Sequence, residues 1–103
     1  MIEVKKSISI VVACGGGIFT TTVVTEKIKD ILRKEKISHK ITPNKITEIP
    51  NITGADLIVV TGKTKQENKL GIPVMIGLPL FTGVGAKEFT EELLIKIREI
   101  MEG

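Results

Sequence analysis

Residues 8–22 read ISIVVACGGGIFTTT, an apolar run that stops at three consecutive glycines. The run is short and rich in β-branched side chains, which predicts a strand that is buried on both faces. Between Thr20 and Lys36 apolar residues recur at helical spacing, at Val24, Ile28, Ile31 and Leu32. This spacing predicts a helix. The stretch therefore encodes a strand, a glycine loop and a helix, with Cys14 at the end of the strand.

The remaining sequence continues the alternation of strands and helices. We expect a strand at 38–42 stopped by Pro43, a helical turn capped by Asn44 and ended by Pro50, and a buried strand at 57–60. A polar loop at 63–69, an edge strand at 72–76, a long loop at 77–85 and a helix at 86–101 follow. This alternation predicts an α/β fold with one domain over residues 1–103. We expect a Rossmann-like four-stranded parallel sheet with helices on both faces and the first strand near its centre.

The composition excludes several classes of protein. The chain has 103 residues, 42% of them hydrophobic and 26% charged, so it can bury a core and is not disordered. One cysteine cannot form an internal disulfide, and Cys14 and His39 alone cannot build a zinc site, so neither a metal nor a cofactor is expected. Aromatic residues make up 3% of the chain, which argues against a stacking platform for single-stranded nucleic acid. We therefore expect no nucleic-acid partner.

The first residues have some features of a targeting signal. Lys5 and Lys6 precede an apolar stretch that ends in Val11-Val12-Ala13-Cys14, the form of a bacterial lipoprotein cleavage site. The stretch is short for a signal and is interrupted by Ser9. Cleavage before Cys14 would also remove the first predicted strand. No segment approaches the roughly 18 apolar residues of a membrane-spanning helix, so we expect no membrane insertion.

The net charge is +3, and the densest basic stretch is 33–45. One interpretation is a face for a polyanion or an acidic partner protein. The other is a solvated helix end, where Arg33, Lys34 and Lys36 suit the negative end of the helix dipole. The sequence leaves both interpretations open, and the second is the more ordinary one.

Cys14 begins the segment with the strongest chemical signal. Gly15, Gly16 and Gly17 allow a loop whose N–H groups turn inward around an anion, and the following helix start adds unpaired N–H groups. The hydroxyls of Thr20, Thr21 and Thr22 can donate to the same anion, and the positive field favours a thiolate at Cys14. This arrangement suits a thiolate that attacks phosphorus. A lone cysteine at a strand end is otherwise more often a small buried side chain.

The loop matches neither a Walker loop nor a dinucleotide fingerprint, and its nearest comparison is the low-molecular-weight tyrosine phosphatase loop. That loop has arginine where this chain has Thr20, so the guanidinium clamp is missing. A hydrolase also needs an acid, and neither Asp30 nor Asp56 is expected near the loop. The residues thus favour a phosphoryl carrier over a phosphatase, while a phosphatase-like hydrolase using Cys14 and a redox-sensing thiol stay open as alternatives.

Two motifs carry a resemblance to a known family. Ala13-Cys14-Gly15-Gly16 precedes the threonine run, and Gly71-Ile72-Pro73-Val74 is followed by a glycine-rich loop from Gly77 to Gly85. In this order, the motifs resemble the IIB components of the bacterial phosphoenolpyruvate-dependent sugar phosphotransferase system, in particular the galactitol-type branch. The resemblance covers residues 7–101.

The resemblance implies a function as well as a fold. By similarity, the fold is the phosphatase-like fold of IIB proteins. Cys14 takes a phosphoryl group from a phosphohistidine of the IIA protein and passes it to a sugar alcohol held by the membrane transporter IIC. Residues 15–22, including Ile18 and Phe19, match the loop that would cradle the phosphocysteine, although the family usually has smaller residues at 18–19. The resemblance also implies a cytoplasmic protein, and we expect a monomer because it must dock with two partners in turn.

Overall fold

The strand that ends at Cys14 lies inside the sheet, as its sequence predicts. This strand, β1 (Ser7–Cys14), pairs in parallel with β2 (Ser38–Lys45) on one side and β3 (Leu57–Val60) on the other. A short strand, β4 (Val74–Ile76), pairs in parallel with β3 and completes the order β2-β1-β3-β4. The computed structural model describes residues 7–14, 18–61 and 67–102, with residues 18–21 described by their backbone. The predicted four-stranded parallel sheet is confirmed.

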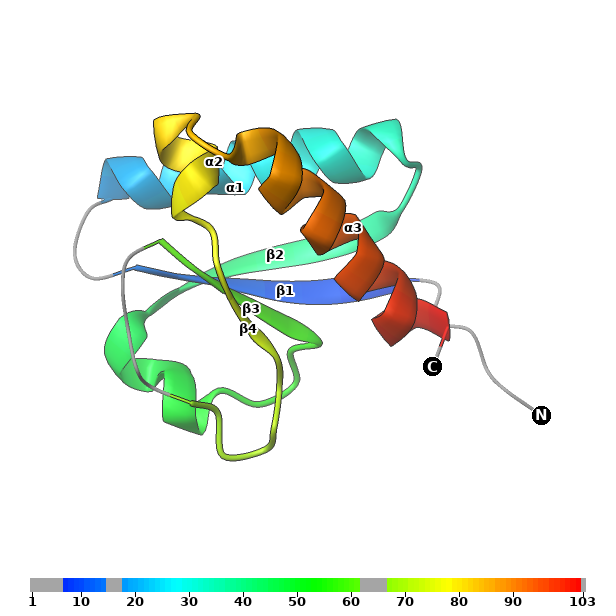
Figure 1. Cartoon of the computed structure of the whole chain (residues 1–103). Helices are drawn as coiled ribbons and strands as arrows, with labels where there is room; N and C mark the ends of the chain where they lie inside the picture. The colour runs from blue at the N-terminus through cyan, green and yellow to red at the C-terminus, as the bar shows by residue number, and fades with distance from the viewer. Residues whose placement is uncertain (1–6, 15–17, 62–66, 103) are drawn as a thin grey trace.

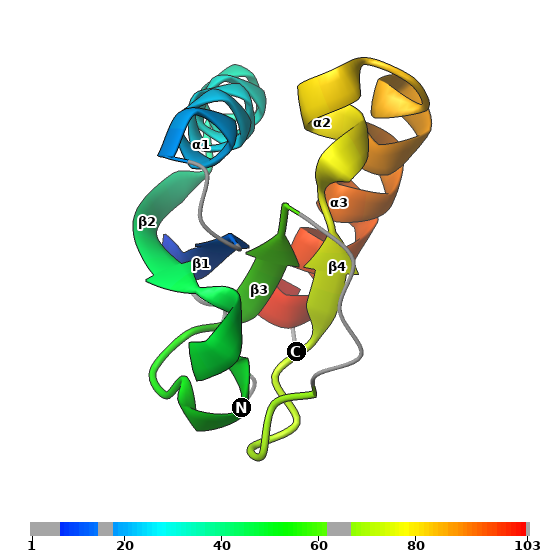
Figure 2. The ribbon, with the colours of Figure 1, turned by 90° about the vertical axis from the view of Figure 1, so that its left-hand side faces the viewer.

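The two faces of the sheet are covered by different kinds of helix. The helices α1 (Ile18–Lys34), α2 (Leu78–Thr82) and α3 (Ala86–Glu102) lie over one face, and the 3-10 helix η1 (Ile46–Asn51) lies against the other (Figure 1). Figure 2 shows α1 beside the α2–α3 pair on the same side of the sheet. Helices on both faces were expected; within the ranges that the structure describes, the second face is covered by the 3-10 helix η1 alone. Over the described residues, no helix is long and apolar enough to cross a membrane.

The core consists of two apolar clusters that share the sheet. The larger one lies between the sheet and the α-helices and contains Ile8, Ile10, Val12, Val24, Ile28, Leu32, Leu57, Val59, Leu80, Phe89, Leu93 and Ile97. The smaller one lies between the sheet and η1 and contains Val11, Ala13, Ile49, Ile52, Ile58 and Val60. Because alternate residues of β1 and β3 enter opposite clusters, β3 is apolar throughout and β1 is apolar from Ile10 to Cys14. The alternation of β1 places Cys14 on the α-helical face, two residues beyond Val12.

The second strand is longer than predicted. The expectation that Pro43 stops it is wrong, because β2 continues through Pro43 to Lys45, and Pro43 pairs in register with Val12. β2 is an edge strand, where the N–H that proline lacks can face solvent without loss of a ladder hydrogen bond. The consequence for the site is that β2 ends level with Cys14.

Two helical segments also differ from the expectation. Asn44 does not cap a helical turn: it belongs to β2, its side-chain oxygen accepts a hydrogen bond from the Lys45 N–H at 2.9 Å, and Pro50 lies inside η1 rather than ending it. The predicted loop at 77–85 contains α2, which has Pro79 in its first turn and Gly83 in the left-handed conformation (φ 86°) at its end. Proline is common in the first turn of a helix and glycine just after its last residue, so Pro79 and Gly83 could have predicted this helix from the sequence.

Gly77 connects β4 to α2 in a crowded place. Its N–H donates to the Val60 carbonyl at 2.6 Å, and an added Cβ would overlap Cγ1 of Val59. We expect Gly77→Ala to lower the free energy of unfolding by about 1–3 kcal/mol, because the stiff, buried Val59 side chain has no room to yield. The φ of Gly77 is −92°, so the effect comes from space and not from backbone strain.

Urea unfolding of a double-mutant cycle tests this cause. Val59→Ala removes the overlapped methyl, so the Gly77→Ala change should cost clearly less in the Val59→Ala background than in the wild type. Equal costs in the two backgrounds would contradict the overlap as the cause.

Candidate functional site

The carboxyl ends of the four strands meet at one edge of the sheet. β1 ends at Cys14 and the chain continues into α1, while β3 leads to Thr61 and β4 to Gly77. β2 lies on one side of β1, and the next strand in the sequence, β3, lies on its other side. The direction in which strands are added to the sheet therefore reverses at β1. Open parallel sheets bind ligands beyond such a reversal. The topology therefore places Cys14 at the position where a ligand is expected.

Cys14 is half-buried, and its sulfur is in no disulfide. It is the last residue of β1, and the backbone immediately before it is fixed by Thr61. The Thr61 N–H donates to the Ala13 carbonyl at 2.9 Å, and the Thr61 hydroxyl donates to the same oxygen at 3.3 Å. Two donors on one buried carbonyl hold the Ala13–Cys14 peptide in place.

Thr61 is a site-supporting residue that sequence reasoning missed. It is only 6% exposed and is one of the two buried polar residues in the described part of the chain. The sequence feature that could have identified Thr61 is its place as a hydroxyl residue directly after the clearest apolar strand, Leu57–Val60. Such a position lies at the carboxyl edge of the sheet whenever the strand is parallel to its neighbours.

The rest of the predicted phosphate loop is described only in part. Gly15, Gly16 and Gly17 lie outside the described residues, so their expected N–H cradle stays a prediction. Ile18, Phe19, Thr20 and Thr21 form the first turn of α1, and Thr22 is exposed on it. The first turn of α1 contains no acidic residue. Its positive dipole end is therefore not neutralised by a carboxylate of its own turn.

Asp30 and Asp56 lie away from Cys14, as predicted, and so does His39. Asp56 precedes β3, and its carboxylate accepts a hydrogen bond from the Ser9 N–H at 2.9 Å, near the amino end of β1. Asp30 is exposed on α1 and pairs with Arg33 at 3.5 Å. His39 pairs in register with Ile8, at the far end of β1 from Cys14. Neither aspartate is therefore placed to act as an acid on a phosphoryl group carried by Cys14.

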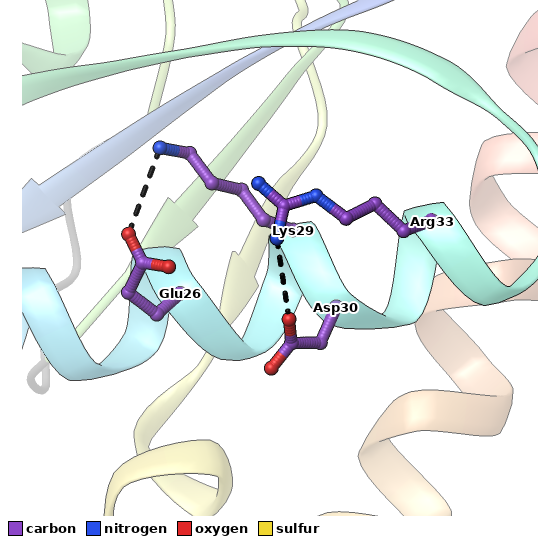
Figure 3. Close-up of polar contacts among 4 residues, drawn as sticks. All are labelled: Glu26, Lys29, Asp30 and Arg33. Carbon is purple, nitrogen blue, oxygen red and sulfur yellow. Dashed lines mark ion pairs between the residues drawn. The ribbon is translucent and has the colours of Figure 1, made fainter.

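Two basic residues of α1 are paired with carboxylates of the same helix, and one of them, Arg33, belongs to the basic stretch 33–45. Figure 3 shows Lys29 paired with Glu26 at 3.7 Å and Arg33 paired with Asp30 at 3.5 Å, both across one helical turn. These four side chains thus behave as an ordinary solvated helix face. The basic residues of β2, Lys40 and Lys45, have no ion pair among the described residues.

A polar groove of about 400 Å³ lies elsewhere, between β2 and the segment that leads into β3. Its lining includes Lys40, Thr42 and Thr53, and it opens on the face that η1 covers. Cys14 lies on the α-helical face, so this groove is on the opposite face of the sheet from the thiol.

The chain is similar to one known protein family and to several named proteins. Residues 9–92 match the family described as "PTS system, Lactose/Cellobiose specific IIB subunit". The galactitol-specific EIIB component of Escherichia coli K12 is 33% identical over 96 residues, covering 91% of this chain and 96% of that protein. The galactitol-specific EIIB component of Shigella flexneri matches to the same extent. SgcB of Escherichia coli K12, which bears the name of a phosphotransferase enzyme IIB component, is 34% identical over 85 residues, covering 82% of this chain and 90% of that protein.

The family match includes β1 from Ser9 onward, α1, α2 and the first part of α3, as far as Glu92. IIB components are phosphotransferases of sugar transport that work with IIA and IIC partners. The resemblance inferred from the two motifs is thereby confirmed over most of the chain. This chain belongs to the IIB family of the sugar phosphotransferase system.

Proposed function

We propose that Cys14 is the residue through which this IIB protein carries the phosphoryl group. The observation that supports this most strongly is its place: a half-buried thiol at the carboxyl end of an internal strand of a parallel sheet, four residues before the start of α1. Histidine is the other side chain that commonly carries phosphate in such a relay. The one histidine, His39, lies at the opposite end of β1, away from the edge where the strand order reverses.

The proposed reaction consists of two in-line displacements. In the first, the Cys14 thiolate attacks the phosphorus of a phosphohistidine on IIA, a P–S bond forms, and the P–N electron pair returns to the imidazole nitrogen. In the second, a sugar hydroxyl oxygen attacks the same phosphorus, the P–S pair returns to the thiolate, and the hydroxyl proton passes to water or to a base beside the sugar. The protein begins and ends the cycle as a thiolate.

The arrangement favours transfer to a partner over transfer to water. Hydrolysis needs a group that takes a proton from water, and the aspartates Asp30 and Asp56 are held elsewhere, in an ion pair and a backbone contact. Thr20 stands where the related phosphatase loop has arginine. A phosphocysteine in this setting would persist until a partner docks, which is what a carrier requires.

The partners we propose are a IIA protein as donor and a IIC transporter as acceptor. The sugar we propose is galactitol or a similar sugar alcohol, because two of the matched relatives bear the name of a galactitol-specific component. The description of the matching family refers instead to lactose and cellobiose. A substrate panel must therefore contain both a sugar alcohol and a disaccharide.

Reconstitution tests the function. Phosphoenolpyruvate, the two general phosphotransferase proteins, a galactitol-type IIA and membrane vesicles containing the matching IIC would be combined with labelled galactitol or cellobiose. We expect galactitol phosphorylation that stops when this chain is omitted, and little turnover of a generic aryl phosphate by the chain alone. Sustained release of phosphate from the aryl phosphate, without transfer to either sugar, would contradict the carrier function and support a hydrolase.

A further inference from the structure

β1 and β2 end together, and their last pair is Cys14 with Lys45. Neighbouring strands of a sheet lie about 4.7–4.9 Å apart, so no residue of β2 is closer along the ladder to Cys14 than Lys45. This pairing exists because β2 continues through Pro43. A strand that ended at Thr42 would have left Lys45 in a loop.

Lys45 also lies on the same face of the sheet as Cys14. Ile10 and Ile41 are register partners, and both belong to the cluster beneath the α-helices. Side chains alternate along a strand, so residues four positions further, Cys14 and Lys45, share that face. The backbone of Lys45 is extended (φ −91°, ψ 148°), so the alternation holds to the end of β2.

The charge of Lys45 is available at this edge. Among the described residues its ammonium group has no ion pair, whereas Lys29 and Arg33 on the neighbouring helix are each paired with a carboxylate (Figure 3). The first turn of α1 adds no acidic residue that would compete for it. A long side chain that starts one strand spacing from Cys14 can bring its ammonium group to a phosphoryl group on the sulfur.

We propose that Lys45 contacts the phosphoryl group carried by Cys14 and supplies the positive charge that an arginine supplies in the related phosphatase loop. The proposal rests on the function proposed for Cys14. A lysine on a β-strand offers a single point charge in place of the planar two-pronged clamp of arginine. Such a contact stabilises the charge on the transferring group and does not activate water, which agrees with a carrier.

A first test needs no partner protein and does not depend on the proposed function. Cys14 is the only cysteine, so alkylation reports on it alone. We expect Lys45→Gln to lower the ratio of the alkylation rates with anionic iodoacetate and neutral iodoacetamide by about threefold to tenfold, since a nearby cation attracts the anion. Lys45→Arg should keep the ratio. Lys40→Gln, which removes the same charge from the opposite face of β2, should also keep it.

The second test measures transfer from phosphorylated IIA in single turnovers at saturating IIA. Lys45→Gln should slow transfer by about tenfold to a hundredfold, the usual effect of losing one charge-assisted contact, while Lys45→Arg and Lys40→Gln stay within about threefold of the wild type. If Lys45→Gln transferred at the wild-type rate at saturating IIA but needed a higher IIA concentration to reach it, the proposal would be overturned. Lys45 would then act in docking IIA. An unchanged alkylation ratio would overturn it as well. If wild-type protein accepts no phosphate at Cys14, it is the proposed function that fails.

Discussion

Replacing Cys14 by serine is expected to abolish phosphoryl transfer from IIA to the sugar, with a loss of at least about a thousandfold. Serine keeps nearly the same shape at a half-buried strand end, so the fold should persist. Its hydroxyl is a far weaker nucleophile than a thiolate at neutral pH. Any phosphate that did reach the serine would be trapped, because an alkoxide leaves phosphorus less readily than a thiolate. The reconstituted sugar phosphorylation measures the loss.

His39→Gln is the matched control for this prediction, because it removes the other residue type that carries phosphate. It should transfer at the wild-type rate, since His39 lies at the far end of β1. Circular dichroism and urea unfolding would confirm that both variants are folded. Full transfer by Cys14→Ser together with loss in His39→Gln would show that the acceptor has been misassigned.

We expect the largest loss of stability from the replacement of Asn68. Its side chain connects the segment before β4 to η1 by hydrogen bonds. Its side-chain NH₂ donates to the carbonyls of Ile49 and Ile52 at 2.7 and 2.9 Å. Its carbonyl oxygen accepts from the N–H groups of Leu70 and Ile72 at 2.9 and 3.4 Å. Asn68→Leu would remove all four hydrogen bonds. The Ile49 carbonyl would keep the bond from the Ile52 N–H at 3.3 Å, and the other three backbone groups would lose the partner that Asn68 supplies. We expect the free energy of unfolding to fall by about 3–5 kcal/mol, measured by urea unfolding.

Asn51→Ala is the matched control for Asn68. Asn51 is also an asparagine that connects η1 with the same segment, through a 3.2 Å hydrogen bond from the Lys69 ammonium group, but it is exposed. Its removal should change the free energy of unfolding by less than about 0.5 kcal/mol, because water replaces the lost contact. A loss of less than about 1 kcal/mol in Asn68→Leu would show that the four hydrogen bonds are not what holds the segment.

The parts of the fold that the sequence predicted are those with a strong local pattern. β3 is an uninterrupted apolar strand, β1 is apolar apart from Ser7 and Ser9, and α1 and α3 have a helical apolar stripe, so their type and place followed from periodicity alone. The central position of β1 and the place of Cys14 at its carboxyl end followed from the alternation of elements. The sheet order confirms the first, and the bounds of β1 confirm the second.

The features that were missed depend on neighbours in space. Pro43 stops most strands, and only the edge position of β2 shows why it does not stop this one. Asn68 is indistinguishable in sequence from the polar residues around it, and its burial comes from the packing of η1. Lys45 is one of several lysines in a basic stretch, and only the β1–β2 register sets it beside Cys14. Register and packing are long-range properties that local patterns do not encode.

Phosphorylation of Cys14 is tested by intact-mass spectrometry of the protein at near-neutral pH after incubation with phosphoenolpyruvate, the general phosphotransferase proteins and a galactitol-type IIA. We expect the added mass of one phosphoryl group that requires IIA, maps to the peptide containing Cys14 and is absent from Cys14→Ser. A chain that gains no phosphate while IIA itself is shown to be phosphorylated, or one that carries the phosphate on a peptide without Cys14, would contradict this expectation.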